Sequence, residues 1–379
     1  MNIFVVCHFG LYQDLSSSFV HNQIREYVRE GHSVRVLVPN ALGKPDRAGA
    51  RLGPVLNISR VDGVEIYDLR FFSASGRGRK EFNARSAIAA IRLQWGKIFK
   101  DFTPDIIHAH TLGFDSRIGA FLKQKFRCPL VVTTHGGDTA RPLARGEGDL
   151  LRSYCADADR ITAVSGPLKA QLESCGTNVP IDVIHNGFIP RQPMEIQRDP
   201  FRLIQVGHLI ESKHFDITIR ALAALKPQYP QLKLTIVGQG HLRPNLEALC
   251  AGLGVEECVE FTGQLPNEEV FARMCGASYF VMASHPEGFG IVYLEAMAAG
   301  CLAFGTEGEG IADIIESGEN GYLVPKDDFD SVTFILDYCL SHPEETARLA
   351  ARGQEIARSM TWAESSRKYL KLFDALLKD

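Results

Sequence analysis

Apolar and polar residues alternate along the chain in blocks that predict repeated strand–helix units. Residues 2–7 form a short, continuous apolar run, which is typical of a buried strand. Residues 18–29 then place apolar side chains three or four positions apart, as on one face of a helix. Residues 33–39 are a second strand-like run. Because repeated β-α-β units build a parallel sheet covered by helices, the pattern predicts an α/β fold.

The same alternation restarts in the second half of the chain, which predicts two domains. Residues 190–200 contain three prolines among mostly polar residues, a composition typical of a linker. Residues 201–209 then resemble the first strand of a new sheet. A length of 379 residues also fits two or three domains. We therefore predict domains over residues 1–190 and 191–361, followed by an amphipathic helix within residues 362–379.

Composition narrows the class of protein further. An apolar content of 45% and a charged content of 23% are those of an ordinary soluble globular protein, and a net charge of −4 gives no reason to expect a nucleic-acid partner. The nine cysteines include no C-x-x-C pair, which favours reduced thiols in a cytoplasmic protein. The apolar N-terminus lacks the basic region of a signal peptide, and no apolar run is long enough to span a bilayer.

The most informative stretch covers residues 284–300. Pro286, Gly288 and Gly290 predict a loop, and residues 291–299 are good helix formers with a glycine following them in the C-cap position. The preceding apolar run predicts a buried strand. A strand–loop–helix unit of this kind suits a diphosphate, because the helix N-terminus presents N–H groups and the positive end of the helix dipole.

Two carboxylates frame this helix start. Glu287 lies in the loop and Glu295 in the helix. Carboxylates bind hydroxyl groups better than phosphates, so a sugar on one side and a ribose on the other would suit them. An ordinary strand–helix unit with one surface and one half-buried glutamate explains the same pattern equally well.

The E-x7-E spacing within HPEGFGIVYLEAMAAG resembles the signature of the retaining glycosyltransferases of family 4. The resemblance implies the GT-B fold, in which two Rossmann-like domains face a central cleft and the last helix crosses back onto the first domain. It also implies that Glu287 contacts the donor sugar and Glu295 the ribose. The loop backbone would hold donor hydroxyls and phosphate at Gly288, Phe289, Gly290 and Ile291.

Further donor-binding residues follow from the same resemblance. Lys213 matches a lysine that binds the donor diphosphate in the family, but His208 stands where the family has an arginine. Imidazole is a weaker, pH-dependent cation without the bidentate fork of arginine. Leu265 matches the contact to the nucleobase. Ser17 lies in a three-serine run where the family often has paired glycines near the phosphate.

The first domain contributes a second candidate group. A β-branched strand ends at His135, and the carboxyl ends of parallel strands line the ligand crevice of doubly wound sheets. A lone histidine is more often structural, but this one resembles the family's HG-x-D position, where the histidine packs against the donor sugar at the reacting carbon. His135 and Glu287 are therefore the expected catalytic residues, and Asp138 and Arg141 would bind the acceptor.

Two other motifs predict no cofactor. Asp157 and Asp159 form a D-x-D pair, but their position between a helix and a strand favours a structural role, so we expect no metal. The turn at Gly238 and Gly240 has Arg243 where a dinucleotide fingerprint has its third glycine, which disfavours a NAD site.

Residues 70–100 carry eight basic residues and one acidic residue, and residues 86–99 show helical apolar spacing. A solvated helix face is the ordinary interpretation. The alternative is contact with an anionic acceptor or an anionic membrane surface.

Together, the resemblance implies a metal-independent, retaining hexosyltransferase. The expected donor is a UDP-sugar and the expected acceptor a hydroxyl of a glycan or lipid-linked molecule. Bacterial surface polysaccharide synthesis is the expected role, in the cytoplasm or peripherally on the inner face of the membrane. The alternatives are a nucleotide-sugar epimerase of the same fold, a NAD-linked oxidoreductase, and a non-catalytic sugar-nucleotide-binding relic, which the histidine at position 208 would favour.

Overall fold

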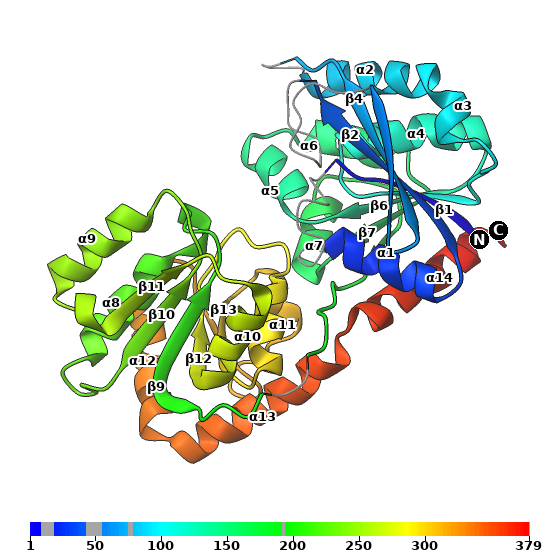
Figure 1. Ribbon diagram of the computed structural model, residues 1–379. Helices are drawn as coiled ribbons and strands as arrows, with labels where there is room; N and C mark the ends of the chain where they lie inside the picture. Colours follow the sequence, from blue (N-terminus) through cyan, green and yellow to red (C-terminus); the bar gives the residue numbers. More distant parts are fainter. Residues whose placement is uncertain (9–18, 43–54, 75–78, 192–193, 379) are drawn as a thin grey trace. The chain divides into compact units, whose positions relative to one another are not determined.

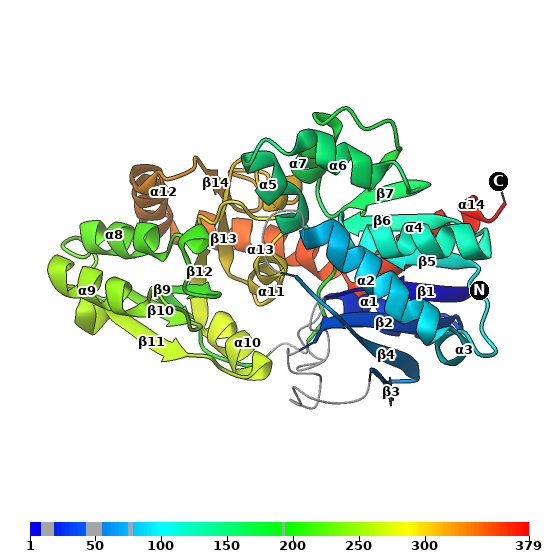
Figure 2. The same ribbon diagram turned by 90° about the horizontal axis from the view of Figure 1, so that it is seen from above.

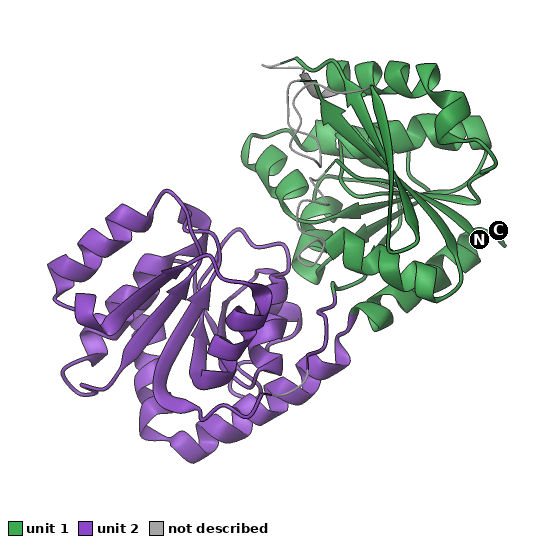
Figure 3. Cartoon of the chain, in the orientation of Figure 1, with its two compact units in different colours: residues 1–186, 362–379 green, residues 187–361 purple. Residues whose placement is uncertain are grey.

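The computed structural model describes residues 1–8, 19–42, 55–74, 79–191 and 194–378. The chain divides into two compact units (Figure 3). The N-terminal unit consists of residues 1–186 and 362–379, and the C-terminal unit of residues 187–361. The division falls a short distance before the predicted boundary at residue 190.

The N-terminal unit contains an eight-stranded sheet in the order β3-β4-β2-β1-β5-β6-β7-β8. All neighbouring pairs are parallel except the β3–β4 hairpin. Because the chain turns in opposite directions on the two sides of β1, the topological switch point of this sheet lies beside that strand. The strands are β1 (Asn2–Val6), β2 (Ser33–Ala41), β3 (Leu56–Val61), β4 (Val64–Phe71), β5 (Ile106–Ala109), β6 (Leu130–Thr134), β7 (Arg160–Ala163) and β8 (Ile181–Val183).

Helices cover both faces of this sheet (Figure 1). Helices α1 and α14 pack together, as do α2 and α4. Tyr369 and Phe373 of α14 are buried in a core shared with β1 and β2, so a segment from the end of the sequence completes the N-terminal unit. The helices are α1 (Phe19–Arg29), α2 (Arg79–Leu93), α3 (Trp95–Ile98), α4 (Phe114–Phe126), α5 (Gly137–Ala144), α6 (Gly148–Cys155), α7 (Gly166–Glu173) and α14 (Trp362–Leu376).

One predicted helix is wrong in its extent. The periodicity over residues 86–99 predicted a single amphipathic helix, but the structure has α2 and α3 instead. Ala84, Ala87 and Ile91 form the buried face of α2, whereas Leu93 is 82% exposed. Small alanines form much of the buried face of α2. The prediction was wrong because it followed the spacing of the large apolar residues.

The C-terminal unit contains a six-stranded sheet in the order β11-β10-β9-β12-β13-β14, and every neighbouring pair is parallel. Counted from β9, this is the 3-2-1-4-5-6 order of the Rossmann fold, with the switch point between β9 and β12. The strands are β9 (Asp199–Val206), β10 (Lys233–Val237), β11 (Val259–Gly263), β12 (Ala277–Val281), β13 (Leu302–Thr306) and β14 (Tyr322–Val324).

Two helical layers enclose this second sheet. Viewed from above, α8, α9 and α12 lie on one side of it, and α11 and α13 on the other (Figure 2). A continuous apolar core joins the strands to α8 and α12. The helices are α8 (Phe215–Leu225), α9 (Arg243–Leu253), α10 (Asn267–Gly276), α11 (Ile291–Ala298), α12 (Phe329–Ser341) and α13 (Pro343–Ser359), with short 3-10 turns η1 (Glu211–Lys213), η2 (Glu256–Cys258) and η3 (Gly310–Asp313).

The central strand–loop–helix prediction is confirmed. The strand predicted over residues 278–282 is β12, and the helix predicted over residues 291–299 is α11. Gly300 follows with a φ of 91°, the left-handed conformation expected just past a helix end. The prediction of an α/β fold with two Rossmann-like sheets is also confirmed.

Candidate functional site

An ion pair joins the loops that follow β9 and β12 in the C-terminal unit. Lys213 Nζ, in η1, contacts Glu287 Oε2, and Ser284 Oγ donates to the same oxygen at 3.3 Å. The Lys213 and Glu287 side chains are only 21% and 15% exposed. Gln205 Nε2 donates to the Lys213 carbonyl oxygen at 2.8 Å and so ties η1 to the sheet. Two residues that the sequence predicted to bind the donor therefore meet beside the switch point.

The backbone around Glu287 is also held by residues that follow β13 and β14. The Glu287 N–H donates to Glu309 Oε2 at 2.6 Å, and Lys326 Nζ pairs with the other Glu309 oxygen at 2.5 Å. The Gly310 N–H donates to the Glu287 carbonyl oxygen at 3.2 Å. A Cβ atom at Gly310 would lie 2.1 Å from the Gly288 carbonyl oxygen, so only glycine permits this approach. Sequence reasoning missed Glu309 and Lys326, although the glutamate–glycine repeat after β13 was a signal.

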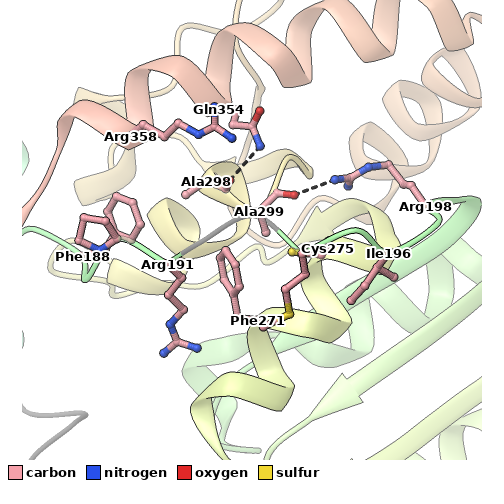
Figure 4. Close-up of a pocket in the computed structure, with 12 residues that line it drawn as sticks. Phe188, Arg191, Ile196, Arg198, Phe271, Cys275, Ala298, Ala299, Gln354 and Arg358 are labelled. Atoms are coloured by element: carbon pink, nitrogen blue, oxygen red, sulfur yellow. Dashed lines mark hydrogen bonds between the residues drawn. The ribbon is translucent and has the colours of Figure 1, made fainter.

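Helix α11 is anchored at both ends. Gly290 precedes it in the left-handed conformation, and the Phe289 side chain is 2% exposed, so the loop is fixed to the core immediately before the helix. At the other end, Arg198 Nη2 donates to the Ala299 carbonyl oxygen at 2.7 Å, and Gln354 Nε2 donates to Ala298 at 2.9 Å (Figure 4). These polar side chains satisfy carbonyl groups that have no partner within the helix.

The arginine and glutamine at the end of α11 belong to the wall of a cavity of about 320 Å³. Its lining comes from the chain segment before β9 and from α10, α11 and α13 (Figure 4). The hydrogen bonds from Arg198 and Gln354 in its wall anchor the C-terminal end of α11, and the N-terminus of the helix follows the loop that carries Glu287.

The other predicted donor residues of this unit occupy three separate positions. Glu295 is half-buried on α11; burial raises the pKa of its carboxyl group, and the charge of Arg191 opposes that increase. Leu265 is half-buried between β11 and α10, and His208 is exposed just after β9. Ser17 lies outside the described residues. The roles of these four residues toward a donor stay predictions.

The N-terminal unit has a larger cavity, of about 910 Å³. Three residues that the sequence predicted to act together, His135, Asp138 and Arg141, all line it. They follow β6 in chain order, so the carboxyl end of that strand forms one wall of the cavity. Arg145 and His8, which the sequence reasoning did not single out, line it as well.

The His135 imidazole sits in a cluster of aromatic rings. Its Nε2 lies 3.2 Å from His110 Nδ1, with the two ring planes at 13°, and its ring centroid lies 4.4 Å from that of Phe19. Burial lowers the pKa of His135 to about 3. It also lowers the pKa of His110, and that of His108 to about 3. His135 is therefore a neutral hydrogen-bonding group at pH 7, not a cation.

Asp138 organises the turn that carries His135. Its carboxylate accepts hydrogen bonds from the Thr134 hydroxyl and the Leu112 N–H, both at 2.9 Å, and from the N–H groups of His135 and Gly136, both at 3.1 Å. Burial raises the pKa of this carboxyl group, and these bonds oppose the increase. With both oxygens occupied, Asp138 is better suited to positioning His135 than to binding an acceptor directly. Arg141, one turn further along α5, is exposed.

A histidine–aspartate pair forms another part of the cavity wall. His8 Nδ1 lies 2.8 Å from Asp115 Oδ2, and the Thr111 hydroxyl donates to the same oxygen at 2.9 Å. Asp115 is fully buried, whereas the His8 side chain is 39% exposed. This arrangement orients one imidazole toward the cavity. The signal was present in the sequence, because His8 follows a strand just as His135 does.

The two motifs that predicted no cofactor have structural explanations. Asp157 pairs with Arg117 at 2.6 Å, and Asp159 with Lys123 at 2.8 Å, so each acid of the D-x-D pair has its own cation. A Cβ atom at Gly238 would lie 1.9 Å from the Gly207 carbonyl oxygen, so that glycine permits two loops to pack closely. In the part of the chain that the structure describes, no helix is both long and apolar enough to cross a membrane.

Two Rossmann-like units, one of which pairs a lysine with a glutamate before the start of α11, are the architecture of the GT-B fold. Family models agree. The model for Glycosyltransferase Family 4 matches residues 16–192, and that for Glycosyl transferases group 1 matches residues 189–356. The chain belongs to this family of glycosyltransferases.

Individual proteins show the same likeness. The chain is 30% identical over 251 residues to the GDP-mannose-dependent alpha-(1-6)-phosphatidylinositol monomannoside mannosyltransferase of Mycolicibacterium smegmatis, covering 60% of this chain and 65% of that one. Sucrose-phosphate synthase from Thermosynechococcus elongatus has the same fold, with a TM-score of 0.78 at 18% identity over 100% of this chain and 99% of that one. Anabaena HepE in complex with UDP-glucose aligns with a TM-score of 0.72 at 20% identity over 99% and 100%.

Proposed function

We propose that this glycosyltransferase retains the anomeric configuration of its donor, a UDP-sugar, and transfers the sugar to a hydroxyl of a glycan or lipid-linked acceptor. The observation that carries the proposal is the buried Lys213–Glu287 pair beside the start of α11. A cation and a helix N-terminus suit a diphosphate, and a carboxylate suits sugar hydroxyls. Two adjoining loops thus offer both halves of a nucleotide-sugar their complementary chemistry.

In the proposed reaction the protein supplies electrostatic stabilisation without a metal. Lys213 and the α11 dipole stabilise the negative charge that develops on the leaving diphosphate. His208 would also contact the diphosphate. Glu295 would bind the ribose, and the backbone at Leu265 the nucleobase. Glu287 would position the sugar and stabilise positive charge at its anomeric carbon.

Attack on the same face as the leaving group accounts for retention. The acceptor oxygen forms a bond to the anomeric carbon, the bond from that carbon to the phosphate oxygen breaks, and the acceptor proton passes to the departing phosphate. The neutral imidazole of His135 can hydrogen-bond a sugar hydroxyl without adding charge. Asp138 positions His135, and Arg141 would bind the acceptor.

The donor can be identified by thermal shift with UDP, GDP, ADP and their common sugars, each with and without EDTA. A ligand that binds the native protein raises the melting temperature by mass action. We expect the UDP series to raise it, with the same shift in EDTA. The UDP-glucose complex of HepE favours uridine, whereas the GDP-mannose-dependent relative favours guanosine. A response to the GDP series alone would overturn the choice of base, and no response would favour the non-catalytic relic.

Product analysis tests the chemistry. NMR of the purified product should show the same anomer as the donor, and an inverted anomer would exclude front-face attack. A nucleotide-sugar epimerase differs in needing no acceptor. Turnover of the donor to a new nucleotide-sugar without any acceptor would therefore support the epimerase.

The acceptor and its location are further parts of the proposal. Exposed Phe82 and Leu93 on α2 lie in the basic segment of residues 70–100 and suit contact with an anionic membrane. A lipid-linked acceptor of bacterial surface polysaccharide synthesis at the inner face of the membrane fits that contact. Co-sedimentation with vesicles containing anionic lipid should exceed that with neutral vesicles and should weaken in the Phe82→Ser, Leu93→Ser variant. Equal sedimentation with both vesicle types would leave α2 as a solvated helix.

A further inference from the structure

Three side chains from separate loops of the C-terminal unit form one compact cluster. The Asp327 carboxylate lies beside two imidazoles, with Oδ1 at 3.4 Å from His214 Nδ1 and Oδ2 at 3.4 Å from His285 Nε2. One ligand atom from each residue lies within 4.8 Å of the other two. His214 follows η1, His285 precedes the Glu287 loop, and Asp327 follows β14. Two imidazoles and a carboxylate are ligands that zinc prefers.

The backbone indicates that this cluster is not a random surface contact. His214 has a φ of 45° and Asp327 a φ of 59°, so two non-glycine residues of the same cluster adopt the left-handed conformation. That conformation costs a residue with a Cβ atom free energy, and glycine would adopt it without the penalty. Such strain persists where the surrounding structure determines it, and it accumulates at functional sites.

We propose that His214, His285 and Asp327 bind a divalent zinc ion, with water completing the coordination. This site is separate from the proposed diphosphate contacts of Lys213, and it does not depend on the proposed function. The Asp327 side chain is 69% exposed, so the ion can enter from solvent, whereas both histidines are 19% exposed and hold the inner side. The three protein ligands leave one tetrahedral position open.

The distances suit this ion. Ligand atoms about 2.1 Å from a tetrahedral zinc lie about 3.4 Å from one another. Each imidazole nitrogen lies 3.4 Å from one oxygen of Asp327, His214 from Oδ1 and His285 from Oδ2, and one ligand atom from each of the three residues lies within 4.8 Å of the others. The two rings are stacked, with centroids 4.0 Å apart and planes at 9°, so their nitrogens must turn toward a shared ion. Rotation about χ2 accomplishes this, and that torsion has a broad energy profile in histidine.

The chemistry of the imidazoles is also suitable. Zinc binds the neutral form of histidine through either ring nitrogen. The second ring nitrogen of His285, Nδ1, is buried and has no hydrogen-bond partner in the described structure. Rotation of the ring can therefore occur without breaking a bond to that nitrogen.

A zinc ion here would help to stabilise the loop that carries Glu287. His214 is adjacent in sequence to Lys213, and His285 precedes Glu287 by two positions. Asp327 is adjacent to Lys326, which pairs with Glu309. The ion would therefore crosslink three loops whose neighbouring residues make the Lys213–Glu287 and Lys326–Glu309 pairs. We expect it to stabilise this edge of the sheet without contacting substrate.

The test is a titration of the chelator-treated, full-length protein with Zn²⁺ alone, in the absence of nucleotide. Isothermal titration calorimetry should give one site per chain, and Zn²⁺ should raise the melting temperature. Co²⁺ in place of Zn²⁺ should give the intense visible absorption of a tetrahedral site. Because no nucleotide is present, the result is independent of the proposed donor.

Two substitutions remove a proposed zinc ligand and introduce a residue that tolerates the left-handed backbone conformation. His214→Gly and Asp327→Asn should each weaken Zn²⁺ binding by more than about 10- to 100-fold, the loss typical of outer-shell changes. Glycine suits the left-handed position, so His214→Gly should keep or raise the melting temperature of the metal-free protein. The matched control is His241→Gln, which removes an exposed imidazole that pairs with Glu211 at 2.9 Å. Unchanged Zn²⁺ affinity in His214→Gly, or no measurable binding to the parent protein, would overturn the proposal.

Discussion

The two units place their candidate groups at the same kind of position, beyond the carboxyl ends of parallel strands. The groups of one unit are charged, however, and those of the other are neutral. The C-terminal unit presents a lysine paired with a glutamate, while the N-terminal unit presents neutral, stacked imidazoles. The difference follows from what each would bind. A diphosphate needs positive charge to bind. Sugar hydroxyls near the reacting carbon need hydrogen bonds from neutral groups, which add no charge beside that carbon.

Burial produces this difference in two ways. Lys213 and Glu287 are largely buried, but each compensates the other. His135 lies against the rings of His110 and Phe19, and its removal from water lowers the pKa of its imidazole. The same loss of water therefore keeps one site charged, through pairing, and keeps the other neutral.

The largest expected difference between the two units is in their stability at acidic pH. His108, His110 and His135 have folded-state pKa values below the usual 6.5, so the unfolded chain binds more protons between about pH 3 and pH 6.5. The free energy of unfolding of the N-terminal unit should therefore fall as the pH drops below 6.5, by up to about 1.4 kcal/mol per pH unit for each histidine. None of the described histidines of the C-terminal unit is fully buried.

Hydrogen exchange followed by mass spectrometry at a series of pH values can report each unit separately, once corrected for the intrinsic pH dependence of exchange. Peptides from β5 and β6 should lose protection before peptides from β9 and β10. Equal loss of protection in both units would mean that the buried histidines do not determine acid stability. His135→Gln, which cannot titrate, should reduce the slope in the N-terminal unit.

Removal of the charge at Lys213 should have the next largest effect. Lys213→Met should lower kcat/KM by about 10²- to 10³-fold, the cost of losing one group that stabilises charge in the transition state. It should also weaken nucleotide diphosphate binding in calorimetry. Lys233→Met, on an exposed position of β10, is the control and should be nearly neutral. Equal activity of the two variants would show that the diphosphate does not bind at Lys213.

Removal of the Asp138 carboxylate tests how much its hydrogen bonds stabilise the turn that carries His135. Asp138→Ala leaves its four hydrogen-bond donors without their acceptor and should reduce the free energy of unfolding by about 1 to 3 kcal/mol. Chemical denaturation measures this change. Asp149→Ala is a suitable comparison, because its side chain is 92% exposed and its pair with Arg152 lies on the surface. If both variants unfold alike, the hydrogen bonds of Asp138 contribute little.

His208→Arg should have the smallest effect and the opposite sign. A bidentate guanidinium should strengthen diphosphate binding by about 1 kcal/mol relative to an imidazole at this position. Calorimetry with a nucleotide diphosphate checks the gain in affinity. An unchanged affinity would mean that the side chain at position 208 does not contact the diphosphate.

The sequence predicted most of the fold because strand periodicity and turn residues are local signals. It located β12, α11 and the glycine loop closely, and it selected His135, Lys213 and Glu287 as residues at strand ends or in adjoining loops. The break between α2 and α3 was missed because alanine, the residue that packs α2, adds little to an apolar pattern.

The remaining parts of the sites depend on contacts between distant segments. Glu309 supports Glu287 across a gap of more than twenty residues in sequence, and Asp115 orients His8 from the first turn of α4. No local pattern encodes such pairs. His214 and Asp327 are harder still, because their left-handed conformations are properties of the backbone and leave no periodic signal.

The position of α14 also has a consequence for how the protein is made. The N-terminal unit needs Tyr369 and Phe373 in its core, so it must wait until the ribosome has translated residues 187–361 in between. The C-terminal unit is continuous in sequence and can finish folding first. During synthesis, the core of the N-terminal unit therefore stays incomplete until α14 has been made.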